Sequence, residues 1–276
     1  YDATNLIKII NEKKNSNLFK LLNNKVSIKI DNINTRLSTN LRQFSLIGEL
    51  EKGEFIKITS KGKFFADKYL DIMLKKNKIN GLKYLEVFSD LPEPILSDYK
   101  FFKGIQGGKL LFTSSFDKNS SSSKMIIENF KVKNAPGFLK LLSLADLGGM
   151  VDLASGEGLS FDKMEIQFSK NQEILKLEEL YAVGSSVSVL MEGYVENKTG
   201  LISLKGTMVP AKDLNKLISK IPLIGNILIP KEIGEGLFGV SFKMKGLPKN
   251  VKTTVNPIKS LTPRFITKAL EKRKKN

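Results

Sequence analysis

Alternation of apolar and polar residues is the dominant pattern in the second half of the chain. Met164, Ile166 and Phe168 occupy every second position of one segment, and the same period of two recurs over 187–195, 202–208 and 238–244. Because successive side chains of a strand point to opposite faces, each segment is typical of a strand with one apolar face. Their succession predicts an antiparallel sheet with one wet and one dry face.

The two faces of this predicted sheet differ in residue type. The wet face carries Ser188, Glu192, Ser203, Lys205, Thr207, Ser241, Lys243 and Lys245. The dry face is the candidate lining of a groove and consists of Val187, Val189, Met191, Ile202, Leu204, Met208, Phe238, Val240, Phe242 and Met244. An apolar face needs a cover, so two interpretations stay open. These residues are the core of an ordinary closed sandwich, or they line a trough for an apolar ligand.

A helical segment is predicted to interrupt the strands from Pro210, a residue that suits the first turn of a helix. An apolar stripe with helical spacing follows and stops at Pro222, and residues 223–230 form an apolar loop. The loop is too short to cross a bilayer, so it either caps a core or contacts an apolar partner. We expect helix and loop to close the end of the sheet. The residues concerned are Leu214, Leu217, Ile218, Ile221, Leu223, Ile224, Ile227 and Leu228.

The first half of the chain has a weaker pattern. Alternation over 26–30 predicts a strand that ends in a turn at Asp31-Asn32, and residues 41–61 predict two strands separated by a turn. Over 64–76 the spacing of Phe65, Tyr69, Ile72 and Met73 predicts a helix. Pro92 and Pro94 then break an ambiguous stretch, which favours a boundary between segments there.

A hairpin and a helix follow this boundary. Alternation over 110–116 and a second strand over 124–133 predict the hairpin, with the polar run DKNSSSS (117–123) as its tip. Pro136 then opens a helix whose apolar side is Phe138, Leu141, Leu142 and Ala145.

The composition excludes several kinds of active site. The chain has no Cys, His or Trp, so it contains no thiol nucleophile, no His-based triad and no zinc site of the usual ligands. The adjacent carboxylates Glu178 and Glu179 would point to opposite faces of a strand. We therefore expect no catalytic residues, no metal and no cofactor.

The net charge of +17 raises the question of an anionic partner. Only four of the 45 basic residues are Arg, the residue that nucleic-acid recognition favours, and no nucleic-acid-binding motif is present, so nucleic acid is not an expected partner. The C-terminal tail is locally basic and is either a surface for anionic headgroups or a solvated tail. Its basic residues are Arg264, Lys268, Lys272, Arg273, Lys274 and Lys275.

Several separated motifs, in one order over about residues 101–270, resemble the C-terminal region of the large YhdP-like proteins of the AsmA superfamily, to which TamB is related. They are FKVKNAPGFLKLLSLADL (Phe130–Leu147), SGEGLSFDKMEIQFS (Ser155–Ser169), YAVGSSVSVLMEGYV (Tyr181–Val195), LISLKGTMVPAKDLNKLISKIPLIGNIL (Leu201–Leu228) and GEGLFGVSFKMKGLPKNVKTTVNPIKSLTPRF (Gly234–Phe265).

The resemblance implies a mainly β fold with short helices: an elongated, curved antiparallel sheet, or repeating β-groove, closed at its C-terminal end by amphipathic helices. It implies a β-groove segment with a helical insertion over 1–100 and an AsmA-like C-terminal domain over 101–276. It also implies a periplasmic protein of Gram-negative bacteria, anchored in the inner membrane by an N-terminal segment. The chain begins with Tyr1 rather than Met, so we expect that segment upstream of it.

The function that the resemblance implies is transport of phospholipids between the inner and outer membranes, with acyl chains sheltered in the groove. Phospholipids, the membrane surface, and outer-membrane or envelope proteins are the implied partners. The alternative function is an envelope-assembly scaffold or interaction module without lipid cargo.

Overall fold

The structure is a computed structural model that describes residues 23–35, 39–97, 99, 102–144, 151, 154–211, 239–248, 250–258 and 267. The chain divides into two compact units, Tyr1–Glu128 and Asn129–Asn276. Each unit is described by itself below.

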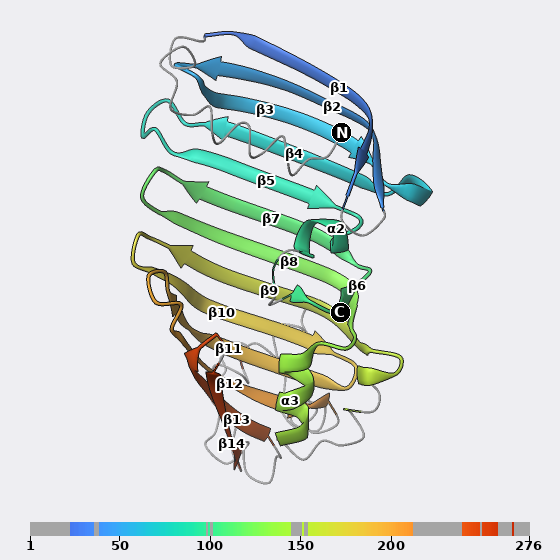
Figure 1. Ribbon diagram of the computed structural model, residues 1–276, viewed down its shortest axis with the longest axis vertical. Coiled ribbons are helices and arrows are strands. Elements are labelled where there is room, and N and C mark those ends of the chain that lie inside the picture. Colours follow the sequence, from blue (N-terminus) through green and yellow to red (C-terminus); the bar gives the residue numbers. More distant parts are fainter. Residues whose placement is uncertain are drawn as a thin grey trace, which may run out of the picture. The chain divides into compact units, whose positions relative to one another are not determined.

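Strands account for most of the regular structure in these ranges (Figure 1). Up to the boundary they are β1 (Lys25–Asn34), β2 (Asn40–Glu51), β3 (Glu54–Lys63), β4 (Tyr69–Lys76), β5 (Lys83–Ser89), β6 (Ile105–Gln106), β7 (Lys109–Phe116) and β8 (Ser121–Val132), which crosses it. The second unit contains β9 (Leu159–Lys170), β10 (Ile174–Gly184), β11 (Val187–Glu196), β12 (Ile202–Pro210), β13 (Gly239–Leu247) and β14 (Asn250–Ile258). The helical elements are η2 (Phe65–Asp67), α2 (Glu93–Leu96) and α3 (Pro136–Leu144).

Hydrogen bonds join these strands in chain order into one 14-stranded sheet, with the short β6 paired to β8 beside the main path. The pairs whose register is known are antiparallel. The path of paired strands begins at β1 and ends at β14. The prediction of a mainly β, antiparallel fold with short helices is confirmed.

The first unit buries one face of its strands around α2. A cluster of Leu41, Phe64, Leu70 and Leu91 lies there, and Ile95 of α2 packs against it. The register places Leu70 beside Gly62 on β3 and Ser89 on β5, so side chains of neighbouring strands meet on the same face. Burial of this cluster fixes which face of the unit is apolar.

The predicted helix over 64–76 is wrong, because η2 ends at Asp67 and β4 begins at Tyr69. The helical stripe is not what the fold buries: Phe65 and Met73 are exposed at 58% and 43%. Leu70 and Leu74 are buried instead, with Ile72 between them on the same face of β4. The segment has both the helical spacing and the alternation of a strand, and pairing with β3 and β5 favours the strand.

Two predicted turns are also misplaced. Asp31-Asn32 lies inside β1, where Asn32 pairs with Arg42 of β2. Three of the four serines of the predicted hairpin tip, Ser121 to Ser123, belong to β8, and the turn is confined to 117–120. Ser123 is buried and its hydroxyl donates to the Ser114 hydroxyl across the hairpin at 2.9 Å, so a cross-strand hydrogen bond makes a polar run compatible with a strand.

The second unit contains the predicted helix at Pro136, which is α3. Leu141 and Leu142 of α3 are buried, while Lys140 and Ser143 are exposed. The strands predicted around Met164, Val187, Ile202 and Val240 are all present, as β9, β11, β12 and β13. Pro210 is the last residue of β12 rather than the first of a helix; the neighbouring Ala211 is helical.

The β7–β8 turn supports a prediction about pH. The Asp117 carboxylate accepts hydrogen bonds from the backbone N–H groups of Asn119 and Ser120, both at 2.7 Å, and these bonds hold the Asp117 pKa below its ordinary value. A lowered folded-state pKa adds stability above the unfolded pKa, and this stability is lost as the pH falls through the folded pKa. We expect Asp117→Asn to lower the midpoint of urea unfolding at about pH 7 and to have little effect at about pH 2. A difference between the two proteins that is the same at both pH values would contradict this role.

Candidate functional site

The register brings the described lining candidates onto one face of β11, β12 and β13. Val189 pairs with Met208, which pairs with Val240, and Leu204 pairs with Met244. Directly paired residues of an antiparallel ladder share a face. No register shift occurs among these pairs, so Val187, Met191, Ile202 and Phe242 belong to the same face. Phe238 lies outside the described residues.

This apolar face continues onto β9 and β10, which were not among the candidates. Met191 pairs with Leu180 of β10, which pairs with Ile166 of β9. Farther along the strands, Gly193 pairs with Leu177, which pairs with Phe168. The alternation of Met164, Ile166 and Phe168 was the signal that could have found them, since it has the same period as the candidates.

Burial divides the face into two parts. The covered end contains Val187, Val189, Met191, Met208 and Phe242, which are at most 8% exposed. The open end contains Ile202, Leu204 and Met244, which are half-buried, as are Phe168 and Leu177 beside them. The face is therefore mostly buried along one part of its length, where Val240 is the half-buried candidate, and in contact with solvent along the rest.

Helix α3 covers the face at its buried end. Phe161 is on this face because it pairs with Gly184, two residues beyond Ala182. The Phe161 ring stacks on Phe130 with centroids 5.3 Å apart, and Phe138 of α3 lies 6.1 Å from it in a tilted arrangement. The helix also lies beside β14 (Figure 1). These aromatic contacts fix α3 at the covered end.

Phe242 lies between the two parts of the face. Its ring packs over Gly206, where an added Cβ would meet the Phe242 Cζ at 2.4 Å and the Leu190 carbonyl oxygen at 2.4 Å. Gly206 is the face position between Met208 and Leu204. Lack of a side chain at Gly206 thus lets the Phe242 ring lie flat on the sheet at the inner limit of the open end.

The prediction of a wholly wet opposite face is wrong at the covered end. Ser188 and Thr207 are 0% and 8% exposed, so both faces of the sheet are buried there. The prediction holds at the open end, where Lys205, Lys243 and Lys245 are exposed. Periodicity cannot distinguish these cases, because a small hydroxyl side chain is compatible with either environment.

Charges lie on the polar face. Lys205 forms an ion pair with Glu192 at 3.1 Å, and Lys176 with Glu178 at 2.6 Å. The hydrogen bond from Lys176, together with one from Ser169, lowers the Glu178 pKa. The face candidates themselves bear no ionisable group, so the apolar face offers dispersion and burial but no acid, base or nucleophile.

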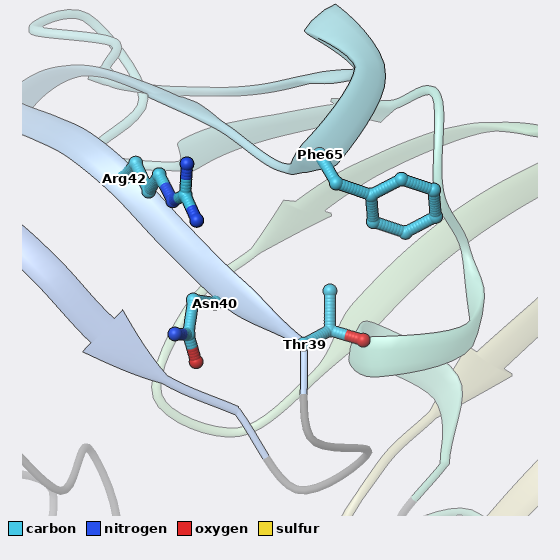
Figure 2. Close-up of a pocket in the computed structure, with 4 residues that line it drawn as sticks. All are labelled: Thr39, Asn40, Arg42 and Phe65. Atoms are coloured by element: carbon cyan, nitrogen blue, oxygen red, sulfur yellow. The ribbon is translucent and has the colours of Figure 1, made fainter.

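A shallow depression in the first unit is the other cavity to consider (Figure 2). Its volume is about 310 Å³, and Thr39, Asn40 and Arg42 of the β2 region and Phe65 of η2 line it. Figure 2 shows the Arg42 and Asn40 side chains on different sides of β2, not converging on one point. A hydroxyl, an amide and a guanidinium without a base or a carboxylate do not form a catalytic set.

Two groups of predicted residues cannot be placed. Leu214, Leu217, Ile218, Ile221, Leu223, Ile224, Ile227 and Leu228 of the predicted end closure lie outside the described residues. The basic tail residues Arg264, Lys268, Lys272, Arg273, Lys274 and Lys275 do so too. Within the described ranges, no helix has the length and apolarity to cross a membrane, and no cluster of Asp and Glu could hold a metal ion.

Comparison of the chain with protein-family models, with curated proteins and with solved structures gave no match. The resemblance to the AsmA superfamily therefore stays a prediction from its motifs.

A pair of methionines tests the division of the apolar face. Met208 is fully buried and Met244 is half-buried on the same face. We expect Met208→Ala to lower the free energy of unfolding by about 2–5 kcal/mol, because it leaves a cavity, and Met244→Ala to lower it by about 1 kcal/mol or less. Urea denaturation measures both. Equal losses would mean that the two ends are covered to the same extent.

Proposed function

We propose that this chain is a non-enzymatic segment of a periplasm-spanning β-groove protein that shelters phospholipid acyl chains for transport between the inner and outer membranes. The observation that carries the proposal is the open end of the apolar face, where Ile202, Leu204 and Met244 lie on the same face and are half-buried. Periplasmic location and an inner-membrane anchor upstream of this chain come from the resemblance and are part of the proposal.

The energetics of such a site need no directional contacts. Burial of an acyl chain contributes about 0.8 kcal/mol for each methylene that leaves water. The half-buried side chains of the open end gain further burial when an acyl chain covers them. A ligand of variable length and unsaturation fits this kind of surface, because its affinity depends on contact area rather than on particular hydrogen bonds.

The position of the charged groups favours transport of a lipid over tight binding of one. The ion pairs of Lys205 and Lys176 lie on the opposite face of the strands. An acyl chain on the apolar face thus meets no fixed charge among the described candidates, and a weakly held ligand can move along it. The headgroup stays in water at the edge of the sheet.

Photo-crosslinking tests this proposal. A benzophenone amino acid replaces Leu204 or Met244 on the open end, and in controls it replaces Lys131 or Gln167, exposed residues of the second unit that lie off the apolar face. In cells of a Gram-negative host, we expect phospholipid adducts from 204 and 244 at several times the yield from 131 and 167.

Mass spectrometry of the crosslinked protein identifies the adduct. Absence of phospholipid from both open-end positions would overturn the groove and favour a scaffold without cargo. Equal yields from the open-end and control positions would also overturn it, because they would indicate contact with a membrane surface only.

A further inference from the structure

Three lysines form a cluster on the polar face of the last hairpin. Lys243 and Lys245 are on β13 and Lys252 is on β14, and all three are exposed. Lys245 pairs directly with Lys252, and Lys243 pairs directly with Lys205 of β12. These four side chains are therefore cross-strand or near neighbours on one face, and Lys243, Lys245 and Lys252 are called the lysine cluster.

The arrangement is unfavourable without an anion. Like charges directly opposite each other on a sheet are destabilising. Glu192 balances Lys205 at 3.1 Å, but Lys243, Lys245 and Lys252 have no ion-pair partner in the part of the chain that the structure describes. An array of phosphates would remove this repulsion, and lysine serves this purpose as a point charge without a fixed geometry.

Exposed apolar residues flank the cluster. Leu247 is 52% exposed, lies two residues beyond Lys245 on the same face of β13, and is followed by the exposed Pro248 at the hairpin turn. Tyr194 is 36% exposed and pairs with Ser203, which pairs with Lys245. Lysines together with exposed aliphatic and tyrosine side chains are typical of a surface that contacts the headgroup region of a bilayer.

We propose that the lysine cluster and Leu247 dock the chain on the surface of an anionic phospholipid bilayer. The lysines contact headgroup phosphates, and Leu247 enters the interface beside them. This surface is distinct from the basic tail over 264–275, and it requires no ligand on the apolar face. If the proposed function holds, docking has a consequence: Gly246 pairs with Ile202 of the open end, so the hairpin places that end next to the headgroups.

Vesicle flotation tests the proposal with the full chain and its tail present in every variant. The vesicles contain about one quarter phosphatidylglycerol in phosphatidylcholine. We expect the triple variant K243S/K245S/K252S to reduce the partition coefficient by at least about tenfold, because each lysine contributes several-fold near an anionic surface. L247S is expected to reduce it by a few-fold.

The matched control removes the same charge elsewhere. Lys29, Lys61 and Lys75 are exposed residues of the first unit, and K29S/K61S/K75S also lowers the net charge by three. We expect this control to bind within about threefold of the unmodified chain, since the control residues are not part of the contact surface. Circular dichroism and urea unfolding confirm that each variant is folded.

Three results would overturn the proposal: equal losses from both triple variants, no loss from K243S/K245S/K252S, or equal binding to vesicles of phosphatidylcholine alone. A fourth is binding of a single-stranded oligonucleotide more tightly than vesicles, with loss of that binding in the same variant, which would assign the cluster to nucleic acid. Flotation does not depend on acyl-chain capture from position 204, so failure of either proposal is recognised separately.

Discussion

The structure depends on one constraint: an antiparallel ladder that follows the chain order gives every strand an apolar and a polar face, and something must cover the apolar one. The ladder satisfies the backbone hydrogen bonds of each strand with its immediate neighbours in sequence. It does not bury side chains. In the second unit, Leu204 and Met244 are cross-strand partners that remain half-buried in spite of perfect register.

In the second unit, the apolar face is covered at one end and is in contact with solvent at the other. At the covered end, Phe138 of α3 packs near Phe161, and Met208 is sealed completely. Phe242 over Gly206 marks the limit of that core. Beyond it the apolar face keeps contact with water, while the polar face collects lysines. The apolar face and the exposed lysines thus lie on opposite sides of the same hairpin.

Local alternation predicts much of the fold because the strands pair with their sequence neighbours. Met164, Ile166 and Phe168 identify β9 without any long-range information. It fails where a segment carries two periods: Phe65, Tyr69 and Met73 have helical spacing, but Leu70, Ile72 and Leu74 are the residues that the neighbouring strands bury. It fails again at Ser188 and Thr207, since burial of a small polar side chain depends on tertiary cover. Alternation predicted that the candidates share one face, but not which of them are buried, because cover depends on distant residues such as Phe138 beside Phe161.

Native mass spectrometry of the chain, purified from a Gram-negative host without detergent and sprayed from volatile buffer, tests the central claim most directly. The account predicts adducts whose masses equal those of the host phospholipids, retained at low collision energy and depleted when Leu204 and Met244 are both replaced by Glu. A spectrum of the bare chain alone, or adducts that the double replacement leaves unchanged, would contradict it.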